Sequence, residues 1–278
     1  MSHAAIAPGK VAVITGAADG IGLAAAKYFA GQGMNVLMAD INELGGPAEA
    51  VTASAGGDVR VETRQLDVSD RAQVEGLKNH AYDLFGQVDV LMNNAGTGGK
   101  THAWDLYEEW QRIIGVNLWG IVHGVHAFAE TMIAQNAPGL IINTGSKQGI
   151  TNPPGNPAYN VSKAGVKTAT EVLQHTLRNT EGCQVTAHLL VPGFTYTGLI
   201  RRHVSEKPAG AWDSEQVVDY MVEKLAQGSF YIICPDNEVS EAADAKRVLW
   251  GAGDIAYDRA PLSRWEGNYG DEFEAFQP

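Results

Sequence analysis

A strand, a glycine turn and a helix follow one another near the N-terminus, and this succession restricts the fold more than any other part of the sequence. Residues 11–14 form a short apolar run, residues 15–22 hold three glycines, and residues 23–30 favour a helix. An apolar run without polar alternation is typical of a strand buried on both faces of a parallel sheet. The succession therefore predicts the first βα unit of a parallel sheet that helices cover on both sides.

The glycine turn also predicts a binding site for an anionic ligand. Gly16 permits a tight turn, while Gly20 and Gly22 let a ligand and the sheet come close to the start of the helix. Unpaired N–H groups and the helix dipole favour anions at that point. Because a strand precedes the turn and a helix follows it, the turn indicates a pyrophosphate and hence a dinucleotide. A plain strand–helix turn is the alternative.

An acidic residue follows the second predicted strand, at 34–39. Asp40 stands about 20 residues beyond the glycine turn, the spacing at which a carboxylate accepts hydrogen bonds from an adenosine ribose. A 2′-phosphate would face this carboxylate, and also Asp19, at a cost of about 3 kcal/mol for each like-charge pair at an effective dielectric constant of ~20. Because the glycine turn holds no Arg or Lys, the sequence favours NAD over NADP. A solvated acid at the end of a strand is the alternative.

Strands and helices alternate along most of the chain. Their order predicts one domain over residues 1–234, built as three layers, α/β/α, around a doubly wound parallel sheet with right-handed crossovers. An irregular stretch within this domain, at about 193–228, is predicted to be a substrate lid. The further predicted helices are 43–54, 71–85, 105–135, 158–179 and 214–227, and the further predicted strands are 59–66, 88–92, 140–143, 185–191 and 229–234.

Length, charge and cysteine content narrow the class of protein. At 278 residues the chain can bury a full core. A net charge of −12 disfavours nucleic acid and anionic membranes as partners, because both need a basic surface. Cys183 and Cys234 are far apart in apolar segments, so no disulfide framework is expected. No secretory leader, membrane span or metal-ligand spacing is recognisable, and we expect a cytoplasmic protein without a metal.

Ser146, Tyr159 and Lys163 form the main candidate for a catalytic group. Tyr159 and Lys163 are four positions apart on a predicted helix and therefore lie on one face. A cation beside a phenol favours the phenolate and lowers a pKa that starts near 10. Ser146 follows a predicted buried strand and could offer a hydroxyl to the same substrate oxygen. An ordinary surface pair of Tyr and Lys is the alternative.

A segment after a predicted strand and one residue within a predicted helix could also contact a ligand. The segment 93–96, Asn-Asn-Ala-Gly, suits a loop whose backbone approaches a flat ligand, although short amides also hydrogen-bond their own turns. Asn117 lies in the middle of a predicted helix. Asn is unfavourable there unless its side chain makes a specific bond, to the backbone or to a water.

Candidates for substrate contact lie after Ser146 and in the lid. Phe194, Tyr196 and Trp212 would favour a hydrophobic or aromatic substrate, but large apolar residues are equally what a buried loop contains. Lys147 and Gln148 directly follow the candidate serine. Lys147 could attract an acidic group of a substrate or point into solvent, and we expect solvent.

Taken together, these features resemble those of the short-chain dehydrogenase/reductase family in its single-domain branch. The matching motifs run in order from residue 11 to about 234, and they are Thr15-Gly16-x-x-x-Gly20-x-Gly22, Asp40, Asp67-Val68, Asn93-Asn94-Ala95-Gly96, Asn117, Ser146, Tyr159-x-x-x-Lys163 and Pro192-Gly193 with Thr197. The resemblance implies a Rossmann-type fold, NAD(P) binding, and hydride transfer between an alcohol and a carbonyl.

The resemblance also implies a role for each matching residue. Tyr159 would be the general acid/base, Lys163 would bind the nicotinamide ribose, and Ser146 would contact the substrate oxygen. Asn117 would belong to a proton relay, and the helices carrying Asn117 and Tyr159 would form a homodimer or homotetramer. The implied cofactor-binding positions are Gly16, Asp19, Gly20, Ile21, Gly22, Asp40, Ile41, Asp67, Val68, Asn94, Ala95, Gly96, Tyr159, Lys163, Pro192, Gly193, Thr195 and Thr197.

The C-terminal part departs from the family pattern, which usually ends in a strand followed by Asp-Gly-Gly. Residues 235–278 mix large aromatics with charges, glycines and prolines. Several aromatics argue against complete disorder. We expect a draped extension, packed on the same domain or on a neighbouring subunit.

The predicted function is NAD-dependent interconversion of a secondary alcohol and its ketone. A carbonyl reductase that works mainly in the reductive direction is the first alternative. A nucleotide-sugar epimerase or dehydratase is disfavoured by the glycine spacing and the chain length. A non-catalytic NAD-binding protein is disfavoured because Ser146, Tyr159 and Lys163 are all present.

Overall fold

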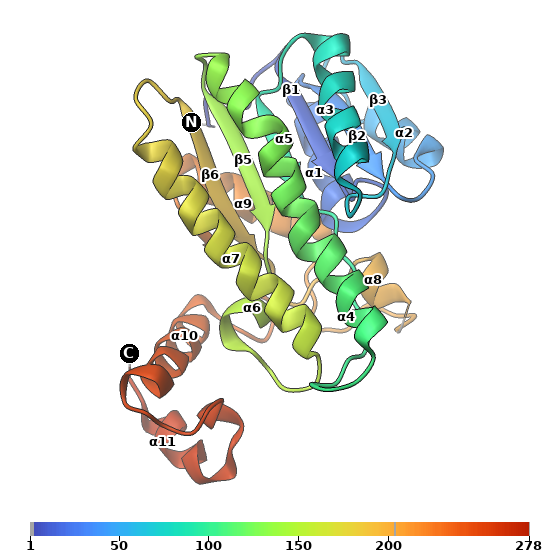
Figure 1. The fold of residues 1–278 in the computed structure, drawn as a ribbon. Helices are drawn as coiled ribbons and strands as arrows, with labels where there is room; N and C mark the ends of the chain where they lie inside the picture. The colour runs from blue at the N-terminus through green and yellow to red at the C-terminus, as the bar shows by residue number, and fades with distance from the viewer. Residues whose placement is uncertain (1–2, 203, 278) are drawn as a thin grey trace.

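One parallel sheet of seven strands forms the centre of the computed structural model, which describes residues 3–202 and 204–277 (Figure 1). The strands lie in the order β3-β2-β1-β4-β5-β6-β7, and each neighbouring pair is parallel. The order runs outward from β1 in one direction and from β4 in the other, which confirms the predicted doubly wound sheet. The strands are β1 Val11–Thr15, β2 Asn35–Asp40, β3 Val61–Gln65, β4 Val90–Asn93, β5 Gly139–Thr144, β6 Val185–Val191 and β7 Tyr231–Ile233.

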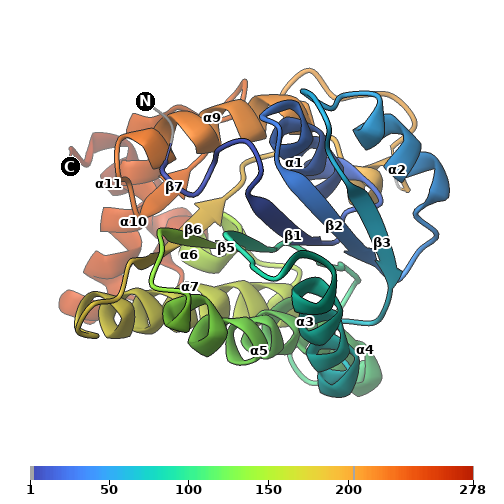
Figure 2. The ribbon, with the colours of Figure 1, turned by 90° about the horizontal axis from the view of Figure 1, so that it is seen from above.

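Helices cover both faces of the sheet, as the view from above shows (Figure 2). The helices α1, α2 and α9 lie on one face, and α3, α5 and α7 lie on the other. This arrangement confirms the three predicted layers. The helices are α1 Gly20–Gly31, α2 Gly45–Thr52, α3 Arg71–Phe85, α4 Tyr107–Ile114, α5 Gly120–Ala134, α6 Gln148–Thr151, α7 Pro157–Arg178, α8 Gly198–Arg201, α9 Ser214–Ala226, α10 Glu241–Ala256 and α11 Gly270–Ala275.

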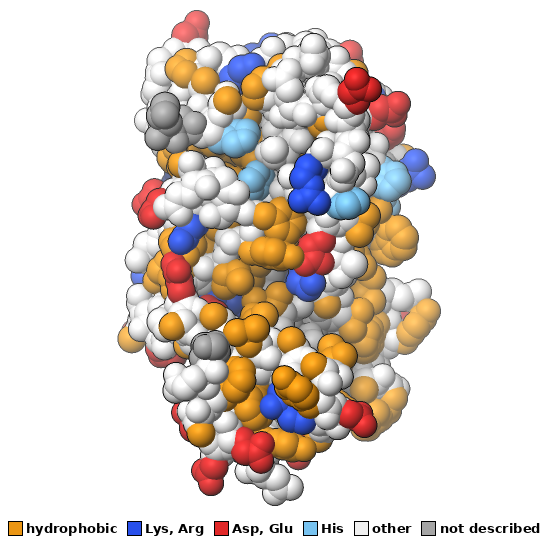
Figure 3. Space-filling model, turned by 90° about the vertical axis from the view of Figure 1, so that its left-hand side faces the viewer, with side chains coloured by type: hydrophobic (Ala, Val, Ile, Leu, Met, Phe, Trp, Pro, Cys, Tyr) orange, Lys and Arg blue, Asp and Glu red, His pale blue; other side chains and the backbone are white. Residues whose placement is uncertain are grey.

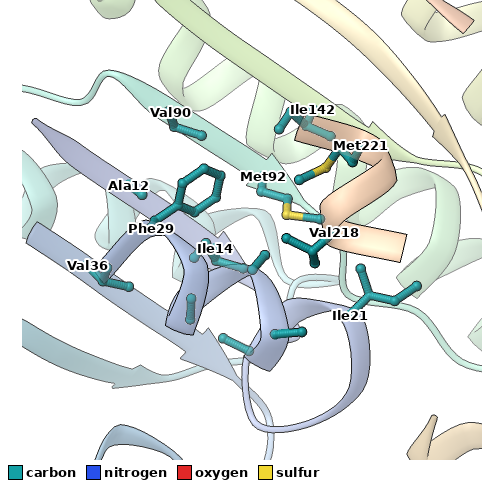
Figure 4. Close-up of a cluster of buried hydrophobic side chains, with 14 of the residues drawn as sticks. Ala12, Ile14, Ile21, Phe29, Val36, Val90, Met92, Ile142, Val218 and Met221 are labelled. Carbon is teal, nitrogen blue, oxygen red and sulfur yellow. The ribbon is translucent and has the colours of Figure 1, made fainter. Parts of the chain in front are cut away.

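A buried apolar core on each face of the sheet fixes the strands. Ile14, Phe29, Met92 and Met221 meet between the sheet, α1 and α9 (Figure 4). A second core, which includes Phe128, lies between the sheet and the helices of the opposite face. Burying one side chain of this size contributes roughly 1.5–3 kcal/mol. The strand ends that carry the candidate site therefore stand on a rigid base.

The predicted helix 105–135 is interrupted by a π-helical turn. α4 ends at Ile114, the π turn spans Gly115–Trp119, and α5 continues from Gly120. Such turns insert a residue into a helix and frequently occur at functional sites. Asn117 is buried at the centre of this turn. Asn117 is unfavourable in a regular α-helix, and the structure places it in the π turn instead.

The C-terminal extension, residues 235–278, contains helices where the sequence predicted a draped segment. Trp250 of α10 is its centre, and the ring centroids of Phe273 and Phe276 lie 5.4 and 5.5 Å from that of Trp250. The Arg259 guanidinium lies 3.8 Å from the Trp250 ring centroid. Two glycines within α10 lower its helix propensity, which is why the sequence did not reveal this helix. Within the described residues, no helix has the length and apolarity needed to span a bilayer.

Candidate active site

The loops that follow β1, β4 and β5 are fastened together at the carboxyl edge of the sheet. The Asn94 backbone N–H donates to Thr15 Oγ1 at 3.0 Å, and Asn94 Nδ2 donates to the Thr15 carbonyl at 3.2 Å. Asn94 Oδ1 accepts from Thr144 Oγ1 at 3.2 Å. The Asn94 amide thus holds neighbouring loops. The chain then passes Gly96, where an added Cβ would lie only 3.8 Å from Lys163 Nζ.

Lys163 is a buried cation on α7. The residue is 3% exposed, and its Nζ donates to the Thr144 carbonyl at 2.8 Å. Nζ lies 5.9 Å from the centroid of the Tyr159 ring, so the predicted pairing on one helix face is present. Burial lowers the pKa of Lys163 to about 8. The lysine therefore keeps its charge at neutral pH while remaining easy to deprotonate.

The pKa of Tyr159 is shifted in the direction opposite to the sequence-based expectation. Burial raises the pKa of this phenol, and hydrogen bonding to Ser146 only partly opposes that rise. The expected lowering of this pKa by Lys163 was wrong for the chain alone, because desolvation of the phenol outweighs the hydrogen bond to Ser146. A catalytic phenolate here needs positive charge beyond that of Lys163.

Ser146 lies between the end of β5 and the start of α6. Its Oγ accepts from the Gln148 backbone N–H at 3.2 Å, and its carbonyl accepts from the Gly149 N–H at 2.9 Å. α6 packs so tightly on α7 that a Cβ added at Gly149 would lie 2.4 Å from the backbone carbon of Lys163. The serine hydroxyl, the phenol and the lysine are thus positioned by two helices in direct backbone contact.

Asn117 uses its side chain to hold two neighbours. Its Oδ1 accepts from the Thr97 N–H at 2.7 Å, and its Nδ2 donates to the Thr97 carbonyl at 3.0 Å and to Ser162 Oγ at 3.1 Å. Ser162 in turn donates to the Tyr159 carbonyl at 2.7 Å. Asn117 therefore fixes the start of α7. Ser162 was not among the predicted site residues, although its position three residues after Tyr159 places it on the same side of the helix.

The glycine turn has the shape that a pyrophosphate site requires. Gly16 and Gly20 adopt φ of +67° and +58°, a left-handed conformation that favours glycine. A Cβ at Gly16 would lie 2.7 Å from Ala95 Cα, and one at Gly22 would lie 2.1 Å from the Gly16 carbonyl oxygen. Asp19 accepts from the Gly20 N–H at 2.6 Å and thereby caps α1. These residues fit a dinucleotide at the start of α1.

Asp40 lies beside this turn, at the end of β2. Its Oδ2 accepts from the Ala18 N–H at 3.0 Å, and its Oδ1 accepts from the backbone and side chain of Asn42, each at 2.9 Å. The carboxylate is therefore held in one place next to the glycine turn. Ile41 is exposed beside it, whereas Ile21 points into the core.

The remaining predicted cofactor positions lie in loops next to these. Asp67 accepts from the Ser69 N–H and Oγ at 2.8 Å each, so its carboxylate is used locally. The carbonyl of Val68 lies 3.0 Å from His123 Nδ1. Gly193 directly follows Pro192, and the Gly193 carbonyl accepts from Thr195 Oγ1 at 3.2 Å.

Two residues of the lid contact the glycine turn. A Cβ at Gly20 would lie 3.1 Å from Thr197, and Arg201 of α8 forms an ion pair with Asp19. Arg201 was not among the predicted site residues, because it is far from the glycine turn in sequence. Residue 203, within the lid, lies outside the described residues.

Two of the predicted substrate contacts have close neighbours within the protein. Trp212 packs on the core beside Tyr220, with ring centroids 5.9 Å apart. Lys147 neither points into solvent nor stands free for an acidic group, because Asp236 and Asp244 flank its Nζ at 3.3 and 2.6 Å. A side chain in an irregular segment has the same appearance in the sequence whether it faces a ligand or the protein.

The other predicted substrate contacts have different surroundings. The Tyr196 hydroxyl donates to the Ser205 carbonyl at 2.8 Å, so Tyr196 braces the lid. Phe194 is 39% exposed at the start of the lid. Gln148 is partly exposed at the first position of α6.

The cysteines and acidic groups add no second candidate centre. Cys183 and Cys234 are both free, as predicted. Burial raises the pKa of the Cys234 thiol to about 12, which keeps it protonated. In the described part of the chain, no three His, Cys, Asp or Glu side chains are grouped to hold a metal ion.

Known proteins resemble this chain over most of its length. A family model described as short chain dehydrogenase matches residues 10–208. A D-beta-hydroxybutyrate dehydrogenase of Cupriavidus necator is 32% identical over 251 residues, which cover 88% of this chain and 95% of the relative.

Solved structures agree with this result. A short chain dehydrogenase/reductase from Burkholderia phymatum in complex with NAD has 34% sequence identity and a TM-score of 0.82, covering 92% of this chain and 97% of that chain. A metagenomic short-chain oxidoreductase in complex with NADP has 29% identity and a TM-score of 0.68, covering 82% of this chain and 98% of that chain. The chain therefore belongs to the short-chain dehydrogenase/reductase family and is an oxidoreductase of hydroxyl and carbonyl groups.

Proposed function

We propose that this enzyme is NAD-dependent and interconverts a secondary alcohol and its ketone, with Tyr159 as the general acid/base. The observation that carries the proposal is the meeting of Tyr159, Ser146 and buried Lys163 at the carboxyl end of β5. The glycine turn and Asp40 lie at the same edge of the sheet.

The chain supplies the groups that this reaction needs at the substrate oxygen. Tyr159 takes the hydroxyl proton during oxidation and returns it during reduction. Ser146 donates a hydrogen bond to the same oxygen as it gains negative charge. Lys163 is charged at neutral pH, and together with the positive charge of an oxidised nicotinamide it would favour the phenolate. A bound nicotinamide cofactor supplies the acceptor or donor of the hydride.

NAD is the proposed cofactor, because the ribose end of the site is acidic. Asp40 is held beside the glycine turn by the Ala18 N–H. Arg201 pairs with Asp19, so this cation is already used within the chain. A 2′-phosphate would meet the like charge of Asp40.

A neutral secondary alcohol with an apolar substituent is the proposed substrate class. Phe194 supports an apolar neighbour, although Trp212 and Tyr196 do not add to it. One relative acts on D-beta-hydroxybutyrate, which carries a carboxylate. Lys147, the cation next to the catalytic serine, is paired with two carboxylates and so offers no support for an acidic substrate.

A screen of secondary alcohols tests the proposal. Each alcohol is incubated with NAD or with NADP, and formation of the reduced cofactor is followed by its absorbance. We expect turnover of neutral apolar alcohols with NAD. If the enzyme works mainly as a carbonyl reductase, reduction of the matching ketones should be faster than oxidation of the alcohols. Binding of NADH without turnover of any alcohol or ketone in the screen would refute the proposed reaction.

A homodimer or homotetramer is the proposed assembly. Trp119 at the π turn and Val172 on α7 are 53% and 60% exposed. Large apolar side chains on long helices are typical of surfaces that another subunit covers. The extension has similar side chains, among them Ile255 at 88% exposed, which supports packing of the extension on a neighbouring subunit.

A further inference from the structure

The side chain of Lys147 lies between two carboxylates that come from beyond the last strand of the sheet. Its Nζ is 3.3 Å from Oδ2 of Asp236, which follows β7, and 2.6 Å from Oδ2 of Asp244, which belongs to α10. The three side chains are 13%, 6% and 2% exposed. A charged group with so little solvent depends on its partners, because an isolated buried charge is costly.

Asp244 depends on Lys147 more than on any other group. Neither of its carboxylate oxygens has a well-oriented hydrogen bond among the described residues. Arg247 lies farther away, with Nη1 3.5 Å from Oδ1. Burial raises the pKa of the Asp244 carboxyl, and Lys147 is the main group that opposes this rise. Lys147 is therefore the nearer of the two cations that balance the Asp244 charge.

Lys147 in turn fixes the segment that carries Ser146. The Lys147 carbonyl accepts from the Thr151 N–H at 3.0 Å, and Lys147 is the N-cap residue of α6. Its side chain crosses Gly193, where a Cβ would lie 3.1 Å from Lys147 Cε. On its other side α6 rests on the backbone of Lys163 through Gly149. α6 is thus clamped between α7 and the α10 carboxylate.

The same cluster reaches the lid. Asp236 Oδ2 also accepts from the Phe194 N–H at 3.2 Å. Asp236 Oδ1 accepts from the Val239 N–H at 2.8 Å, which fixes the chain just before α10. One pair of carboxylates therefore joins the serine loop, the first residue of the lid and the C-terminal extension.

We infer that Asp244 is a positioning residue for the catalytic serine, acting through Lys147, and that the C-terminal extension is thereby part of the active site. The inference rests on the proposed function, because Ser146 matters only if the enzyme reduces or oxidises a substrate at that hydroxyl. In this inference Lys147 has a structural role and does not bind the substrate.

Asp244→Asn, Lys147→Met and the double variant test the inference by turnover. Each single variant should lower kcat at least tenfold and leave the Kd for NADH within about threefold, because the cluster lies beside the serine and away from the glycine turn. The double variant should lose no more than the worse single variant, because both changes break the same Lys147–Asp244 contact. Lys147→Arg, which keeps the cation, should retain most of kcat.

Asp254→Asn is the matched control inside the extension. Asp254 binds Ser263 and Arg259 and makes no contact with Lys147, so this change loosens the extension without removing the clamp. It should keep wild-type kcat. Equal loss of kcat in Asp254→Asn, additive losses in the double variant, or wild-type kcat in Asp244→Asn would each overturn the inference.

Hydrogen exchange gives a readout that needs no substrate. The amides of residues 146–152 should exchange at least tenfold faster in Asp244→Asn and Lys147→Met than in wild type or Asp254→Asn, because the start of α6 loses its anchor. Unchanged exchange refutes the inference even if no alcohol is turned over. Faster exchange in an enzyme that turns over nothing refutes the proposed reaction and leaves the clamp established.

Discussion

Lys163 is a buried cation, and its desolvation costs stability. Burial lowers its pKa from 10.5 to about 8, a difference that corresponds to about 3 kcal/mol. Because the folded pKa lies below the unfolded one, this cost is fully present below pH 8 and disappears as the pH rises toward 10.5. The lysine that we propose for catalysis therefore destabilises the fold at neutral pH.

We expect Lys163→Met to be more stable relative to wild type at pH 7 than at pH 10. Paired urea unfolding curves across this range measure the difference in the free energy of unfolding. Lys167→Met, which removes a partly exposed lysine on the same helix, is the control. A Lys163→Met difference that does not change with pH contradicts the assigned cost.

Asp40 should decide between the two dinucleotides. A penalty of about 3 kcal/mol predicts a preference of about 10²-fold for NAD over NADP in kcat/KM. Asp40→Asn keeps an acceptor for the Ala18 N–H and removes the charge, so it should narrow this preference at least tenfold. Glu43→Gln removes an exposed charge nearby and should leave the ratio unchanged. Equal use of NAD and NADP by the wild type would refute the assignment.

Elements with a local signal could be predicted from the sequence, and contacts between distant elements could not. The apolar run of β1 and the glycines after it predicted the first βα unit, and the spacing of Tyr159 and Lys163 predicted their shared helix face. Arg201 and Asp19 are 182 positions apart, and no local pattern indicates such a pair. The packing of Trp212 beside Tyr220 could not be predicted for a related reason, because neighbours in sequence do not reveal neighbours in space.

The helix α8 should act as a latch for the bound cofactor. The Arg201–Asp19 pair joins this lid helix to the glycine turn, and both side chains are about half exposed. An exposed ion pair contributes at most about 1 kcal/mol and is screened by salt. Arg201→Gln should therefore speed NADH dissociation about fivefold at low salt, as measured by stopped-flow fluorescence.

High salt and a second lid variant control this prediction. The difference between Arg201→Gln and wild type should vanish at ~1 M NaCl, where the Debye length is about 3 Å. Lys207→Gln breaks an ion pair with Asp213 elsewhere in the lid and should leave dissociation unchanged. Equal effects of both substitutions would show that the lid as a whole, and not this contact, retains the cofactor.

Large apolar side chains are exposed on the surface of the molecule. Figure 3 shows apolar side chains gathered in the lower half of one face, where Figure 1 places the C-terminal extension. Tyr257 and Trp265 of the extension are 77% and 43% exposed, and Trp119 and Val172 are exposed on the long helices. Patches of this kind mark interaction surfaces.

We expect a homodimer or homotetramer in sedimentation at micromolar concentration. Trp119→Glu combined with Val172→Glu should dissociate the subunits that meet through the long helices, because two buried carboxylates would face the partner. Ile255→Glu tests separately whether the extension contributes. A wild-type protein that sediments as a monomer would contradict the proposed assembly.

Turnover by Tyr159→Phe tests the central claim most directly, because the change removes one hydroxyl and leaves the ring. With a secondary alcohol and NAD at saturation, stopped-flow formation of NADH should be at least ~10²-fold slower than in wild type, the usual contribution of a positioned acid/base. The Kd for NADH should stay within about threefold of the wild-type value, because the glycine turn and Asp40 are untouched. Near-normal turnover by Tyr159→Phe would contradict the assignment of Tyr159 as the proton-transferring group.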